Sequence, residues 1–134
     1  MTENKTVEIR HRDGRIEKCS VNVPNTPPWR LAFLGAGMEN QEFSGRDLFD
    51  ALNELRKILE NKGFQLLCAG ARRDVFPSGM SRDMSGGRKA YINRLGHPAR
   101  QTDLVDIFEY ADAELGSVSQ QAEFHKQWIN SLQK

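Results

Sequence analysis

The N-terminal part of the chain alternates uncharged and charged side chains, a pattern typical of strands with one face in water. Val7 and Ile9 have charged neighbours, and a second alternating run follows the Asp-Gly pair at residues 13–14. Asp-Gly favours a two-residue type I′ turn, because both central positions of that turn need positive φ. The pattern predicts a β-hairpin over residues 5–23, after a frayed terminus at residues 1–4.

The longest regular period in the chain is helical. One apolar stripe is formed by residues three and four positions apart: Leu48, Leu52, Leu55 and Leu59. Ser44 is placed as an N-cap before this stripe, and Gly63 suits the position just after a helix end. We therefore expect an amphipathic helix over residues 45–62, with its stripe packed on a sheet.

Shorter elements are expected on either side of this helix. Further strands are predicted at residues 29–34, 64–69 and 89–95. Residues 104–110 fit either a strand or a helical turn, and we favour the strand. Ser117 and Gln120 are spaced as a capping box, which predicts a C-terminal helix over residues 118–132. The apolar residues that make its expected inner face are Val118, Ala122, His125, Trp128, Ile129 and Leu132.

The element order predicts an α+β protein. The expected architecture is a mostly antiparallel sheet of five to six strands, including the N-terminal β-hairpin, covered by one long amphipathic helix, plus a C-terminal helix. A chain of 134 residues is the size of a single domain, here residues 1–134. With 38% hydrophobic and 28% charged residues, the composition is that of a globular protein rather than a disordered one.

The distribution of charge is more informative than the formal net charge of +1. Residues 72–100 carry seven basic and two acidic side chains, a net charge of +5. Residues 101–134 carry six acidic and two basic side chains, a net charge of −4. These adjoining blocks either face each other in the fold or form two separate charged patches.

The cysteines and the absence of targeting signals indicate a cytoplasmic protein. The chain shows neither an apolar N-terminal leader nor an apolar run long enough to cross a membrane, so no membrane partner is expected. Cys19 and Cys68 are therefore expected to be reduced. Cys68 lies in a short apolar run, so we interpret it as a core cysteine whose burial raises its pKa.

No catalytic or metal-binding motif stands out. His11, His97 and His125 lack the spacing of a metal site, and Ser78 lacks the G-x-S-x-G pattern of a nucleophile elbow. The best anion candidate is the run Ser85-Gly86-Gly87-Arg88-Lys89, whose backbone amides would precede two cations. We therefore expect a protein that is not an enzyme and that uses neither a metal nor a cofactor.

The stretch CAGARRDVFPSGMSRDMSGGRKAY at residues 68–91, with DLVDIF further along, resembles a small family of bacterial proteins over residues 44–110. That family brings no assigned activity with it. In size, in its lack of a catalytic motif and in its cytoplasmic character, the chain is similar to the immunity proteins of bacterial toxin systems. The resemblance implies a stand-alone domain that neutralises a cognate toxin by binding it.

Residues 68–91 are interpreted as a cationic, methionine-containing surface loop, because Arg, Met and aromatic side chains are enriched at interface centres. The candidate partner-binding residues in and beside this loop are Arg72, Arg73, Phe76, Met80, Arg82, Arg88 and Lys89. A second candidate patch is acidic and comprises Asp103, Asp106 and Glu109. The alternative hypothesis is a small nucleic-acid- or nucleotide-binding regulator that uses the basic residues 72–100.

Overall fold

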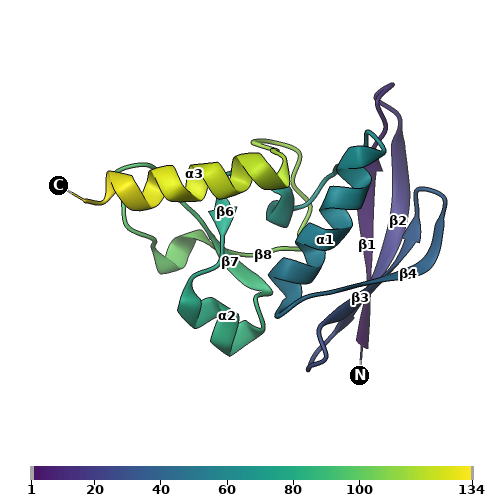
Figure 1. Ribbon diagram of the computed structural model, residues 1–134, viewed down its shortest axis with the longest axis horizontal. Helices are drawn as coiled ribbons and strands as arrows, with labels where there is room; N and C mark the ends of the chain where they lie inside the picture. Colours follow the sequence, from purple (N-terminus) through teal and green to yellow (C-terminus); the bar gives the residue numbers. More distant parts are fainter. Residues whose placement is uncertain (1, 134) are drawn as a thin grey trace.

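The computed structural model describes residues 2–133, which form an α+β fold with a curled antiparallel five-stranded sheet, a three-stranded sheet and three α-helices. The large sheet has the strand order β4-β3-β2-β1-β5 and the small sheet the order β6-β7-β8. Helix α1 (Leu48–Asn61) lies between the large sheet and the part of the molecule that carries the small sheet (Figure 1). The prediction of a single sheet was therefore wrong.

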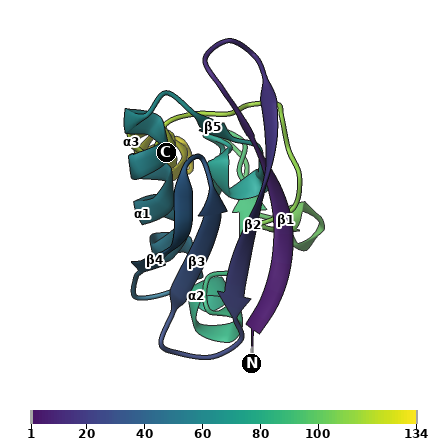
Figure 2. The same ribbon diagram turned by 90° about the vertical axis from the view of Figure 1, so that its right-hand side faces the viewer.

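The large sheet is built mainly from consecutive strands. Its strands are β1 (Thr2–Arg10), β2 (Ile16–Pro24), β3 (Arg30–Gly35), β4 (Met38–Ser44) and β5 (Gln65–Leu66). Antiparallel pairs join β1 to β2, β2 to β3 and β3 to β4, and β5 pairs antiparallel with the other edge of β1. Figure 2 shows how strongly the sheet curls. Its buried face carries alternating apolar side chains such as Val21, Leu31 and Phe33.

Three expectations for the N-terminal half need correction. Residues 2–4 belong to β1 rather than to a frayed terminus, and residue 1 lies outside the described part of the chain. The connection between β1 and β2 is five residues long, with the amide of His11 bonded to the Arg15 carbonyl, so no two-residue turn forms at Asp13-Gly14. The strand β4 was not expected.

Helix α1 is shorter than predicted and begins later. Its N-cap is Asp47, whose carboxylate accepts the amide of Asp50, whereas Ser44 is the last residue of β4. The expected leucine stripe is buried, together with Phe49 and Ala51. The chain leaves the helix through Gly63, whose φ of +85° is a conformation that favours glycine.

Residues 68–91 are folded rather than loop-like. They contain a 3₁₀ turn η1 (Ala69–Ala71), strand β6 (Val75–Phe76), helix α2 (Gly79–Ser85) and the start of β7 (Lys89–Ile92). The favoured strand at 104–110 is confirmed only as β8 (Leu104–Asp106), after a second 3₁₀ turn, η2 (Gln101–Asp103). The strand expected at 64–69 shrinks to β5, because the amide of Ala69 turns away to bond Glu109.

Helix α3 (Val118–Ser131) has the expected capping box between Ser117 and Gln120 but only part of the expected inner face, since Val118, His125 and Trp128 are half-buried and Ala122 is exposed. Its only buried residue is Gln121, whereas Ile129 and Leu132 are 42% and 39% exposed. The far end of α3 rests on residues 96–97, where Gly96 donates its amide to Ser131 Oγ and Trp128 Nε1 donates to the His97 carbonyl. Within the described residues, no helix combines the length and apolarity needed to cross a membrane.

Candidate functional site

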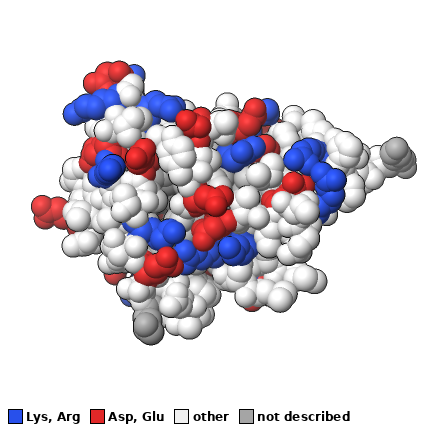
Figure 3. Space-filling model, turned by 180° about the vertical axis from the view of Figure 1, so that it is seen from behind, with Lys and Arg blue, Asp and Glu red and all other residues white. Residues whose placement is uncertain are grey.

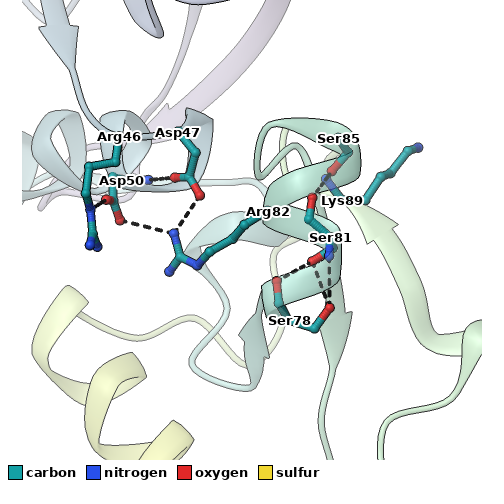
Figure 4. A network of polar contacts seen from close by, with 8 residues as sticks. All are labelled: Arg46, Asp47, Asp50, Ser78, Ser81, Arg82, Ser85 and Lys89. Carbon is teal, nitrogen blue, oxygen red and sulfur yellow. Dashed lines mark hydrogen bonds and ion pairs between the residues drawn. The ribbon is translucent and has the colours of Figure 1, made fainter.

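Helix α2 is held rigid by a ladder of serines (Figure 4). Ser78 caps the helix, because its Oγ accepts a hydrogen bond of 3.0 Å from the backbone amide of Ser81. The Ser81 hydroxyl donates a hydrogen bond back to the Ser78 carbonyl. At the other end, Ser85 Oγ donates to the Ser81 carbonyl and accepts the amide of Lys89. The short helix therefore has satisfied ends and a fixed direction.

Arg82 fastens α2 to the N-terminus of α1. Its Nη1 donates to Asp47 Oδ2 at 2.6 Å and lies 3.4 Å from Asp50 Oδ1. The guanidinium also lies 5.5 Å from the ring centre of Phe49 and 5.7 Å from that of Phe76. Asp47 therefore serves two elements, because one oxygen caps α1 and the other binds Arg82.

The glycines after α2 allow close packing. Gly86 and Gly87 have φ of +62° and +78°, and a Cβ would strike the Trp29 ring at Gly86 and Asp47 at Gly87. The amides of residues 86–89 are already hydrogen-bonded to Ser81 and Ser85 within the same segment. Glycine is needed at these two positions because there is no room for a Cβ. The segment does not offer free backbone amides for binding a phosphate group.

Two methionines project from this fixed helix into solvent. Met80 and Met84, one helical turn apart on α2, are 71% and 80% exposed. Phe76, expected in the same patch, is half-buried, stacked on His125 at 3.8 Å between ring centres and edge-on to Phe49. Lys89 is also exposed, and its ammonium points away from the serine ladder (Figure 4). We call Met80 and Met84 the methionine surface.

The basic and acidic blocks face each other. Arg73 of the basic block binds Glu114 of the acidic block, whereas Arg72 binds Asp74 of its own block through both Nε and Nη2 at 2.8 Å. The other pairs that join the two blocks are Arg88 with Asp106, and Arg94 and Arg100 with Asp103. Arg88 also contacts Glu3 of β1. Figure 3 shows the result on one face of the molecule, where positive and negative side chains are interspersed.

Few of the predicted charged residues are left without an ion pair. Among the described residues, Lys89 of the basic set and Glu109 of the acidic set form none. The side chains of Asp103 and Asp106 are only 14% and 22% exposed. Most charged members of the two predicted patches are thus held in internal ion pairs, but of the described residues only Arg88 and Asp106 pair directly across the two patches.

The two cysteines are free thiols in the core, as expected for Cys68. Burial raises the pKa of each thiol to about 11, so both are neutral and unreactive near pH 7. The described residues contain no group of three His, Cys, Asp or Glu side chains that could hold a metal ion.

One buried charge was not anticipated. Arg56 lies on the inner face of α1 at 2% exposure and donates to Gln121 Oε1 at 2.7 Å. Gln121 in turn donates to the carbonyls of Gly70 and Arg72. The sequence carried a signal for this contact, since Arg56 lies one turn after Leu52 within the apolar stripe. Burial lowers the pKa of Arg56.

The chain was compared with models of known protein families and with curated proteins, and neither comparison gave a match.

Proposed function

We propose that this chain is a non-enzymatic protein-binding domain of the immunity-protein type, which neutralises a cognate toxin in the cytoplasm by direct binding. The methionine surface is the proposed contact. The observation that carries this proposal is the exposure of Met80 and Met84 on a short helix whose own contacts hold it still.

Exposed methionines on a fixed element suit a binding surface for two reasons. Their thioether side chains are polarizable and adapt to irregular partner surfaces. The backbone beneath them is already ordered by the serine ladder and by Arg82, so binding costs little further conformational entropy.

The alternative function, nucleic-acid binding through residues 72–100, finds less support. A phosphate backbone is bound by free cations, and six of the seven basic residues in this segment already hold carboxylates. The aromatic side chain of Phe76 is likewise engaged, with His125 on one of its faces.

The test begins with the toxin-like protein encoded next to this chain in its native genome. The two proteins are mixed, and affinity is measured by calorimetry with the unmodified chain and with the double variant Met80→Ser/Met84→Ser. Loss of two buried anchors should weaken binding at least about 30-fold, the size expected for interface hot spots. Ile16→Thr, which removes a 46% exposed apolar side chain elsewhere on the surface, is the matched control and should bind normally.

Two results would count against the proposal. If no neighbouring toxin binds or is inhibited, the immunity role is wrong. If a toxin binds equally well to the double variant, the role stands but the methionine surface is not the contact. A gel-shift assay with labelled RNA and DNA at physiological salt tests the alternative, which predicts a shift that falls steeply as salt is added.

A further inference from the structure

A pocket separate from the methionine surface lies between the C-terminal half of α1, strand β5 and the start of α3. Its volume is about 340 Å³, large enough for a small organic molecule. Much of its wall is apolar, with Leu59, Phe64, Leu66 and Leu115 among the lining residues. Arg56 also lines the pocket, so a buried cation lies beside these apolar side chains.

The acceptors closest to the Arg56 guanidinium are neutral. Nη1 donates to Asn53 Oδ1 at 3.0 Å, to Gln121 Oε1 at 2.7 Å and to the Gly70 carbonyl at 3.2 Å. Nη2 donates to the Gly116 carbonyl at 2.7 Å. A buried cation is usually matched by an anion, because dipoles alone do not neutralise its charge.

One edge of this guanidinium lacks a carboxylate within hydrogen-bonding distance. Nε has no acceptor in the part of the chain that the structure describes, and the nearest carboxylate atom to Nη2 is Glu60 Oε1 at 3.9 Å. That Glu60 oxygen is already occupied by the amide of Val118 at 2.8 Å. In Arg72 the same Nε–Nη2 edge grips Asp74 with two bonds of 2.8 Å, which is the geometry that this edge favours.

The rim of the pocket adds positive charge. Arg10 donates to the side chain of Gln65, a lining residue, and the guanidinium of Arg12 lies against Gly63, another lining residue. Glu60 is the one acidic side chain that lines the pocket within residues 2–133. The charge around the pocket is therefore mainly positive and favours binding of an anion. Glu60 is the side chain whose negative charge disfavours that binding.

We propose that this pocket binds a small amphipathic carboxylic acid, with its carboxylate on the Nε–Nη2 edge of Arg56 and its apolar body against Leu59, Phe64 and Leu115. The apolar wall selects against bare inorganic anions, which have nothing to place there. Because the site lies where α1 and α3 meet, a bound acid also stabilises the packing of α3 against α1.

Arg56 has a structural role as well, since its bonds to Gly70, Gly116 and Gln121 join three segments. A substitution of Arg56 would therefore weaken the fold whether or not a ligand binds. The better test changes the charge around Arg56. Glu60→Gln removes the opposing charge and keeps an acceptor for the Val118 amide, whereas Gln65→Glu adds a negative charge and keeps an acceptor for Arg10.

The experiment follows backbone amide shifts in ¹⁵N NMR spectra during titration with benzoate. The matched neutral probe is benzamide, and inorganic phosphate tests for a simple anion site. Benzoate should give saturable shifts at residues 59–66 and 115–120, at about millimolar concentration for so small a ligand, and benzamide should give none. Glu60→Gln should tighten benzoate binding about fivefold and Gln65→Glu should weaken it about fivefold, the size of a unit charge interaction near a surface.

Three outcomes would overturn the proposal. They are no saturable benzoate shifts at these residues, equal binding of benzamide and benzoate, or binding of phosphate as tight as that of benzoate. Unchanged benzoate affinity in both charge variants, with their spectra otherwise native, would also exclude Arg56 as the recognition group.

Discussion

Arg82 of α2 donates a hydrogen bond of 2.6 Å to Asp47, the N-cap residue of α1, so two helices that are 35 residues apart at this contact share one carboxylate. The Asp47 residue is 5% exposed, and the two interactions that it makes use different oxygens. This contact sets the position of α2 on the body of the protein.

Substitutions of Asp47 should separate its two roles. Asp47→Asn keeps the cap on the Asp50 amide but loses the charge, and we expect a loss of about 1 kcal/mol in the free energy of unfolding. Asp47→Ala removes both interactions and should cost about 2–3 kcal/mol. Urea denaturation measures both values. Equal losses in the two variants would show that the ion pair, rather than the cap, carries the whole effect.

Gly86 should tolerate substitution far less well than Gly79. Gly86→Ala places a methyl group against the Trp29 ring at a φ of +62°, so we expect at least about 1–2 kcal/mol of destabilisation. Gly79 lies in the first turn of α2 with open space around it, and Gly79→Ala should be neutral or stabilising by up to about 1 kcal/mol. Thermal unfolding of the two variants provides the comparison, and similar melting temperatures would contradict it.

Gln121 should be the most sensitive position on α3. Gln121→Ala removes one donor from each of the carbonyls of Gly70 and Arg72 and the shortest acceptor contact of Arg56 Nη1, which should cost about 2–4 kcal/mol. Gln127→Ala, on the exposed side of the same helix, is the control and should change stability by less than about 0.5 kcal/mol. Chemical denaturation checks both, and a small effect at Gln121 would mean that water replaces its contacts.

His125 should make stability fall in mild acid. Burial, and to a smaller extent Arg82, lower the pKa of His125 below its ordinary value of 6.5, and its Nδ1 is buried without a hydrogen-bond partner in the described structure. The unfolded chain therefore binds this proton more readily. The neutral His125 side chain makes its full contribution to the free energy of unfolding well above pH 6.5. That contribution is lost as the pH falls from 6.5 toward the lowered pKa.

The matched variant is His125→Phe, which keeps a ring against Phe76 and cannot titrate. Denaturation midpoints measured at pH 7.5 and 5.5 should fall less in this variant than in the unmodified chain. The same fall in both would assign the pH dependence to other groups.

The α+β class could be predicted from the sequence because the strands of the first half and the leucine stripe of α1 are locally encoded. The strand β4 could not. Its two buried residues, Met38 and Phe43, are an odd number of positions apart, and Asn40 between them has a φ of +49°. The alternating pattern is therefore broken, although the strand pairs with β3.

The candidate site was only partly predictable for a related reason. Glycines at 86 and 87 indicate a loop in isolation, but here they allow contact with Trp29 and Asp47, which lie far away in the sequence. Charge blocks indicated that arginines and carboxylates would meet, yet the partners themselves depend on the fold. Met80 was predicted as part of a surface, and only the structure adds the exposed Met84 and separates both from the half-buried Phe76.

The contact between Arg56 and Gln121 also constrains the order of events during synthesis. Arg56 is translated long before Gln121, so on the ribosome its guanidinium must stay hydrated until the chain has been made as far as α3. The N-terminal strands can pair earlier, since their partners are their immediate successors. Strands β1 to β4 can therefore pair before Arg56 has its contact with α3, and that contact forms only after Gln121 has been made.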